Sequence, residues 1–195
     1  DKIRDNVQKR WDNVFTPQWW RNHPQLAKKY WDETGKYQWA RNHWWRHATW
    51  AATTAWMVGG AYAGYAYQEP IVYDYGDNVY YQDDSVYVQG QPVGTAQEYY
   101  DQAQSIASSG DTAPPEPDAD WLPLGVFALS QEGAPDTNMM IQLALSKQGV
   151  IKGTFYNTST DTVRPLKGRV DKKTQRAAWM FADGKNADVI METGL

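Results

Sequence analysis

Nine of the eleven tryptophans of this 195-residue chain lie between residues 11 and 56, and this crowding constrains the fold more than any other feature. Each buried indole removes about 150–250 Å² of surface from water. The same stretch has few other large apolar residues to pack against them. The indoles must therefore pack against the rest of the chain, another copy of it or an external surface. They are Trp11, Trp19, Trp20, Trp31, Trp39, Trp44, Trp45, Trp50 and Trp56.

Charge and composition exclude several classes of function. The net charge of −4 argues against a general nucleic-acid binder, which needs surplus Lys and Arg to neutralise phosphates. The absence of cysteine excludes disulfides, thiolate metal sites and a cysteine nucleophile. The chain is basic up to His47, whereas residues 69–120 carry only acidic charges, so the two regions could attract each other within or between chains. The first residues lack the apolar core of a signal peptide, so an exported protein would be present here as a mature or partial chain.

Residues 1–69 are expected to form a mainly helical, Trp-rich assembly segment. Residues 1–15 have apolar side chains at helical spacing, and residues 36–57 are the best candidate for a long helix. Pro17 interrupts the pattern, because the residue before a proline is pushed away from helical geometry. His43 and His47 would share one helical face, but no third ligand lies nearby, so we expect no metal site there.

The uncharged run of residues 48–68 leaves two interpretations open. Its length allows a membrane span. However, its Ala, Thr, Gly and Tyr residues supply little transfer free energy, and Gly59 with Gly60 interrupts the run. The spacing of Gly60 and Gly64 also suits close helix packing. We favour a buried or inter-subunit helix.

Valine–tyrosine pairs recur every seven residues in residues 70–94. Val and Tyr favour strands, and the residues between the pairs favour turns, so we predict a Tyr-rich meander of three short strands. The aspartates in these turns could ligate calcium, but their spacing is not that of an EF-hand loop and there is no closing Glu, and turn chemistry alone explains them. The pairs are Val72 and Tyr73, Val79 and Tyr80, and Val86 and Tyr87, and Val93 continues the period.

An amphipathic helix and a linker are predicted next. Residues 95–109 begin with a capping box formed by Thr95 and Glu98. Residues 110–120 are acidic and Pro-rich, which is typical of an extended linker, and we place the main domain boundary there.

Residues 121–195 are predicted to form an antiparallel β domain. Short runs of apolar residues separated by strong turns indicate a meander, a sandwich or a small barrel, so the fold class is α+β. The predicted strands are residues 124–130, 139–145, 150–156, 163–170, 175–181 and 188–191.

Four motifs together resemble one known family. They are YDYGDNVYY at residues 73–81, the helix from Thr95, WLPLGVF at residues 121–127 and VDKKTQRAAW at residues 170–179. From about residue 44 to the end, the chain is similar to exported planctomycete proteins described as mu-protocadherin-like cell-surface proteins. The resemblance implies export, a non-enzymatic surface role and a β domain that runs on beyond Leu195.

We therefore expect an exported structural protein, at the cell surface, outside the cell or in the periplasm, that forms homo-oligomers or filaments or anchors to the envelope. The sequence has no catalytic constellation, and we expect no catalytic residues, cofactor or metal. One alternative is a carbohydrate or cell-wall-binding module that stacks exposed aromatic rings on sugars, and another is a membrane-anchored protein. The predicted interface residues are Trp39, Trp44, Trp45, Trp50, Trp56, Tyr62, Tyr65, Tyr73, Tyr80 and Tyr87.

Overall fold

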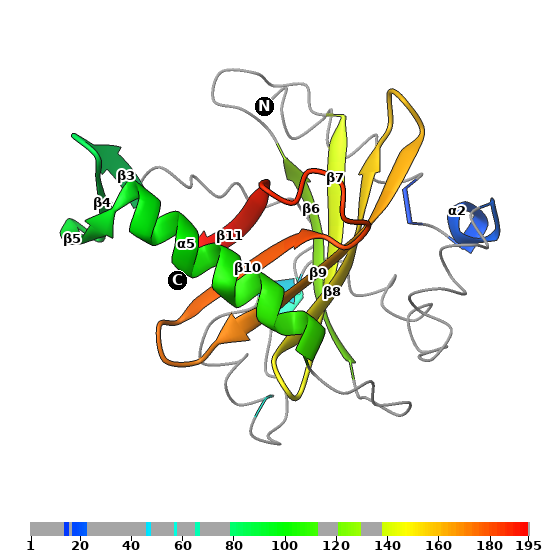
Figure 1. The fold of residues 1–195 in the computed structure, drawn as a ribbon. Helices are drawn as coiled ribbons and strands as arrows, with labels where there is room; N and C mark the ends of the chain where they lie inside the picture. Colours follow the sequence, from blue (N-terminus) through cyan, green and yellow to red (C-terminus); the bar gives the residue numbers. More distant parts are fainter. Residues whose placement is uncertain are drawn as a thin grey trace.

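The computed structural model describes residues 14–15, 17–22, 46–47, 57, 65–66, 79–112, 121–129 and 138–194. Six strands of the C-terminal region form one antiparallel sheet in the order β11-β10-β9-β8-β7-β6 (Figure 1). The strands are β6 (Trp121–Leu129), β7 (Met139–Ser146), β8 (Val150–Asn157), β9 (Thr162–Asp171), β10 (Arg176–Phe181) and β11 (Ile190–Gly194). The predicted α+β class with antiparallel strands is confirmed, and the strands follow the meander order. Within the described residues β6 does not pair with β11, so the sheet is not a closed barrel.

The two faces of this sheet bury different side chains, because neighbouring residues of a strand point to opposite faces. One face carries the large apolar cluster, in which Phe155 and Phe181 meet edge to face with ring centroids 5.4 Å apart. The other face carries Ala178 and Met180, which pack against a helix. The large cluster consists of Met57, Leu122, Ile141, Leu143, Leu145, Ile151, Phe155, Leu166, Val170, Ala177, Trp179 and Phe181.

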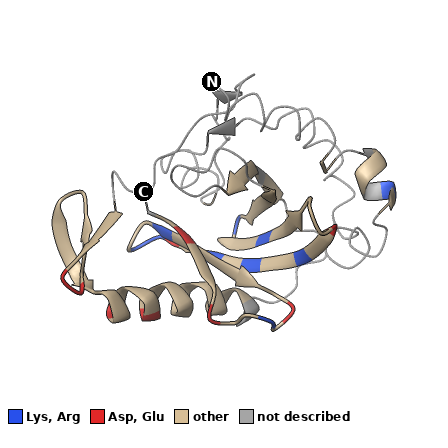
Figure 2. Cartoon of the chain, turned by 90° about the horizontal axis from the view of Figure 1, so that it is seen from above, with Lys and Arg blue, Asp and Glu red and all other residues tan. Residues whose placement is uncertain are grey.

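Helix α5 (Ala96–Ser108) lies across β9, β10 and β11 (Figures 1 and 2). The predicted capping box is present: the Glu98 backbone N–H donates to Thr95 Oγ1 at 3.2 Å, and the Thr95 N–H donates to Glu98 Oε2 at 2.9 Å. The small side chains of Ala103 and Ala107 face the sheet and let the helix approach closely. A short 3₁₀ helix, η3 (Ser109–Thr112), follows directly. The predicted linker, residues 110–120, lies outside the described residues from residue 113 on.

A second, three-stranded sheet is formed by β3 (Val79–Gln82), β4 (Ser85–Val88) and β5 (Gln91–Thr95), in that order. The strands predicted at Val79 and Val86 are confirmed, whereas the pair Val72 and Tyr73 lies outside the described residues. A further strand, β5, follows β4 and contains Val93, which continues the seven-residue period, although the neighbouring Pro92 favours a turn. Proline is compatible with a strand at a sheet edge, where its missing N–H is not needed.

The described parts of the Trp-rich segment differ from the expected helices. Helix α2 (Pro17–Asn22) begins at the proline that was expected to interrupt a helix, because proline suits the first helical position. A long helix was predicted at residues 36–57, but Arg46–His47 within it form strand β1, which pairs with β2 (Tyr65–Ala66). The helix prediction is therefore wrong at Arg46 and His47. Pairing between the two strands outweighs the local preference for a helix. The rest of residues 1–69 lies largely outside the described residues, and its helical character stays a prediction.

Two described pieces of the Trp-rich segment pack against the large sheet. Met57 is 7% exposed and belongs to the large apolar cluster. Trp19 is 6% exposed, and its ring meets Tyr156 of β8 edge to face, with centroids 5.2 Å apart. At these points the segment is therefore buried within its own chain. No helix in the described ranges is long and apolar enough to span a membrane.

Gly168 of β9 gives a test of how closely this strand approaches its neighbour β10. A methyl group there would overlap the Ala178 carbonyl oxygen and lie 2.6 Å from Trp179 Cβ. We expect Gly168→Ala to lower the free energy of unfolding by more than about 3 kcal/mol, measured by denaturant titration. The control is Gly184→Ala, where the methyl meets nothing within 4 Å and only the φ of +75° is unfavourable, at about 1–2 kcal/mol. Equal losses in the two variants would contradict the close packing.

Candidate functional site

Two of the ten predicted interface residues have described side chains, and the structure brings these two together. Tyr80 and Tyr87 are cross-strand partners on β3 and β4. Tyr65 lies in β2, of which only the backbone is described. The remaining predicted residues lie outside the described residues: Trp39, Trp44, Trp45, Trp50, Trp56, Tyr62 and Tyr73.

The Tyr80 and Tyr87 rings form a parallel stack. Their planes are 2° apart and their centroids are separated by 5.0 Å. Pro92 of β5 is the cross-strand partner of Tyr87, so the row continues across all three strands. We call Tyr80, Tyr87 and Pro92 the tyrosine face. Aromatic stacking of this kind contributes about 0.5–1.5 kcal/mol beyond simple burial.

A tight turn sets the register of this stack. Asp83 and Asp84 connect β3 to β4 with φ values of +47° and +66°. Left-handed geometry at both central residues matches the twist of a two-residue hairpin, and Asp tolerates it better than most residues. The turn therefore accounts for these two aspartates without calcium. Within the described ranges, no group of three His, Asp or Glu side chains is placed to hold a metal ion.

Exposed apolar surface is concentrated on the three-stranded sheet. Tyr80 is 40% exposed, Tyr81 63% and Val93 43%, and these are three of the five large hydrophobic side chains exposed in the described part of the chain. The sheet lies at one end of α5 and projects from the body (Figures 1 and 2). Large exposed aromatic side chains on a projecting element are typical of a contact surface.

The other side of the three-stranded sheet packs against helix α5. Val79 and Val86 form a buried cluster with Tyr99, and both valines are 4% exposed or less. The backbone N–H of Ala96 also donates to the Asp84 carbonyl oxygen at 2.9 Å. Helix α5 thus covers one face of the three-stranded sheet, and the tyrosine face lies on the opposite face.

Arg176 of β10 connects this assembly to the large sheet. Its guanidinium lies 3.7 Å from the Tyr99 ring centroid. It donates to Gln102 Oε1 at 3.0 Å and to the Tyr99 carbonyl oxygen at 3.2 Å, and it forms an ion pair with Glu192 of β11. We call Arg176, Glu192, Tyr99 and Gln102 the arginine junction. It joins two strands and the helix through one buried cation.

Electrostatics at the arginine junction indicate a structural site. Burial, reinforced by the negative charge of Glu192, raises the pKa of Tyr99 to about 12. Burial and Glu192 also raise the pKa of Tyr81. Both phenols are therefore neutral at ordinary pH, and the Arg176 charge is satisfied by protein acceptors. This arrangement stabilises the fold and offers no poised acid or base.

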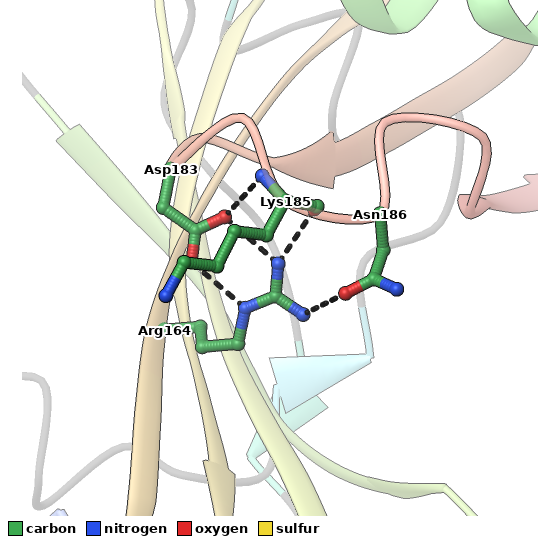
Figure 3. Close-up of polar contacts among 4 residues, drawn as sticks. All are labelled: Arg164, Asp183, Lys185 and Asn186. Atoms are coloured by element: carbon green, nitrogen blue, oxygen red, sulfur yellow. Dashed lines mark hydrogen bonds and ion pairs between the residues drawn. The ribbon is translucent and has the colours of Figure 1, made fainter.

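A second arginine organises the loop between β10 and β11 (Figure 3). Arg164 donates two hydrogen bonds of 2.8 Å to the Asp183 carboxylate, and others to the Lys185 carbonyl oxygen and Asn186 Oδ1. Its guanidinium also lies 3.4 Å from the Phe181 ring centroid. The hydrogen bonds from Arg164 are the main cause that lowers the pKa of Asp183 to about 2. This cluster too is internally satisfied.

The buried aromatic contact of the Trp-rich segment was not found from the sequence. Phe15 and Trp19 meet edge to face with centroids 4.9 Å apart, and both contact Tyr156. Burial raises the pKa of Tyr156, whose hydroxyl donates to Asp161 Oδ1 at 3.0 Å. Trp19 and Tyr156 are far apart in sequence, and no periodicity connects them.

The comparisons with known proteins give no assignment: no family model, curated protein or solved structure matches the chain. A function for this chain can therefore be inferred only from its described surface and its sequence.

Removing the cation of the arginine junction should weaken the fold. Arg176→Met removes the cation that forms the ion pair with Glu192, and breaking a buried ion pair costs about 3–5 kcal/mol. We expect a loss near the lower end of this range in a denaturant titration, because both side chains keep some exposure. Arg176→Met combined with Glu192→Leu should lose less than the sum of the two single variants. Strict additivity would contradict a coupled junction.

Asp183 should contribute a pH-dependent part of stability. Its folded pKa of about 2 lies below the ordinary value of 3.8, so its contribution is present above pH 3.8 and is lost as the pH falls towards 2. Because Asp183 is exposed to solvent, which screens its charge, we expect it to contribute at most about 1 kcal/mol to the free energy of unfolding. Wild-type and Asp183→Asn unfolding free energies should differ at neutral pH and converge by about pH 2. A constant difference across this range would contradict the assignment.

Proposed function

We propose that this chain is a non-enzymatic structural protein of the cell surface that self-assembles through aromatic side chains. The observation that carries the proposal is the tyrosine face: an exposed aromatic stack on a small sheet that is fixed to the body by α5. Aromatic side chains are enriched in protein–protein contacts because they bury much area and lose little conformational entropy.

The firm packing of the three-stranded sheet against the rest of the chain favours a role of the tyrosine face in association. The valines beneath the sheet and the arginine junction hold it before any partner arrives. A preorganised surface loses less entropy on association, so more of its contact energy appears as affinity. The resemblance to exported mu-protocadherin-like cell-surface proteins supports the same proposal. On the basis of this resemblance we also propose that the chain is exported and belongs to that family.

The Trp-rich segment, residues 1–69, is proposed to contribute to assembly as well. Trp39, Trp44, Trp45, Trp50 and Trp56 are proposed contacts with other copies or with the envelope. Trp19 and Met57 support a mixed role, because these two side chains are buried within the chain itself. Part of the segment then completes the fold while other indoles make external contacts.

Removing the tyrosine face tests the proposal directly. Truncating an aromatic residue at the centre of an interface costs about 2 kcal/mol or more, which weakens association roughly thirtyfold. We therefore expect Tyr80→Ala with Tyr87→Ala to shift assemblies to smaller species in sedimentation velocity and light scattering. Control variants are Met139→Ala and Val189→Ala, which remove exposed apolar side chains elsewhere.

Unchanged particle size in the double tyrosine variant, with the fold intact by circular dichroism, would contradict assembly through this face. Trp45→Ala with Trp50→Ala is the parallel test of the Trp-rich segment and should also give smaller particles.

Glycan binding is the second candidate. The Tyr80 ring stacks on Tyr87 through one face and is 40% exposed, and an open aromatic face can stack on a sugar ring. Under this alternative, cell-wall glycans would quench aromatic fluorescence at protein concentrations where the chain is monomeric. Such quenching, lost in Tyr80→Ala, would favour the glycan function over assembly.

A further inference from the structure

We propose that the open edge of strand β3 binds residues 36–41 of a second copy of the chain as an added antiparallel strand. The contact would join the two chains through backbone hydrogen bonds and would extend the tyrosine face by the side chain of Trp39. This inference deepens the proposed self-assembly and rests on it, because it names one pair of surfaces through which two copies meet.

Strand β3 lacks the protection that the other outer strands of the two larger sheets carry. Proteins protect edge strands against pairing with prolines, bulges or charged side chains. Strands β6 and β5 each combine a proline, Pro123 and Pro92, with an irregular register in their pairing. Strand β11 carries the charged Glu192. Strand β3 pairs regularly with β4 and has the uncharged sequence VYYQ, so its outer side is open to a further strand.

Val79 and Tyr81 direct their backbone groups towards the open edge of β3. In an antiparallel pair, residues that exchange hydrogen bonds alternate along the strand with residues that do not. The two-residue turn makes Gln82 and Ser85 an exchanging pair, so the N–H and C=O groups of Tyr81 and Val79 point away from β4. Among the described residues, no strand pairs with this side of β3. These groups can therefore anchor an added strand.

Residues 36–41 match this edge in charge and in length. Their sequence, KYQWAR, has four uncharged residues between Lys36 and Arg41. The edge has the opposite charges, because Asp83 follows β3 directly and Asp77 lies two residues before it. An antiparallel strand with Lys36 opposite Asp83 places Arg41 beside Asp77. A second β3 as the partner would bring aspartates together, which disfavours pairing.

This register also divides the added side chains between the two faces of β3. Directly paired residues project to the same face of a sheet. Trp39 pairs with Tyr80, so its indole joins the tyrosine face. Ala40 pairs with Val79, which is 4% exposed on the face towards α5, and its methyl group needs little room there. Aromatic residues favour strands, and the helix predicted for this stretch is already wrong at Arg46–His47.

The experiment titrates a fluorescein-labelled peptide of residues 35–42 into the full chain, at a concentration where the chain is monomeric, and follows fluorescence anisotropy. In the proposed register the N–H groups of Gln38 and Ala40 donate to β3, whereas that of Trp39 points outward. Methylation of a backbone nitrogen removes its donor. We expect methylation at Ala40 to weaken binding roughly tenfold or more, and methylation at Trp39 to leave binding nearly unchanged.

Variants of the chain supply matched controls. Tyr81→Pro removes an outward N–H and leaves the hydrogen bonds to β4, whereas Tyr81→Val loses the same phenol and keeps the N–H. We expect Tyr81→Pro to lose peptide binding and Tyr81→Val to keep it. Asp83→Asn keeps a residue that tolerates the turn, and it should weaken the wild-type peptide by up to about fivefold. A Lys36→Gln peptide should bind Asp83→Asn and wild type equally.

Sedimentation velocity of the wild type over a range of concentrations separates this inference from the proposed function. Particles that grow although the peptide fails to bind, or binds whichever nitrogen is methylated, would overturn the pairing with β3 and leave self-assembly standing. Absence of particles at every concentration would overturn both. Ala40→Pro removes the donor from the chain's own segment. A peptide that binds this variant but not the wild-type monomer would show that the edge is filled within one chain, which also overturns the contact between copies.

Discussion

The buried guanidinium of Arg176 is the contact on which the arrangement of the other elements depends. It lies under the Tyr99 ring, pairs with Glu192 and bonds the helix through Gln102. A buried cation costs several kcal/mol unless its hydrogen bonds are satisfied, so the helix and both strands must adopt one relative position. The same Tyr99 packs against Val79 and Val86 of the small sheet. One side chain thus couples the large sheet, the helix and the projecting tyrosine face.

Close packing of the backbone completes this arrangement. Gly168 leaves no room for a Cβ between β9 and β10, and a Cβ at Gly110 would overlap the Gly168 carbonyl oxygen. The small residues of α5 likewise let the helix approach the sheet. Acidic side chains lie along α5 and the hairpin turn, while basic side chains lie on the strands of the large sheet (Figure 2).

The sequence predicted local structure well and long-range contacts poorly. Turn residues and runs of apolar residues predicted the bounds of the strands in the large sheet to within a few residues. The Thr95 capping box predicted where helix α5 begins. The seven-residue period predicted the strands of Tyr80 and Tyr87. It did not reveal the strand that follows them, because Pro92 favours a turn but is also acceptable at a sheet edge. Pairing of Arg46–His47 with Tyr65–Ala66, and burial of Trp19 against Tyr156, depend on residues distant in sequence. The arginine junction likewise had no local signal.

The central claim is that the tyrosine face is fixed on the body and makes contacts between copies of the chain. Hydroxyl-radical footprinting over a range of protein concentrations measures this directly, because side-chain oxidation reports solvent access. The account predicts that Tyr80 and Tyr87 lose reactivity as the concentration rises, while Met139 and Val189, exposed on other parts of the chain, keep theirs. Constant reactivity of both tyrosines across a concentration range in which particles grow would contradict it.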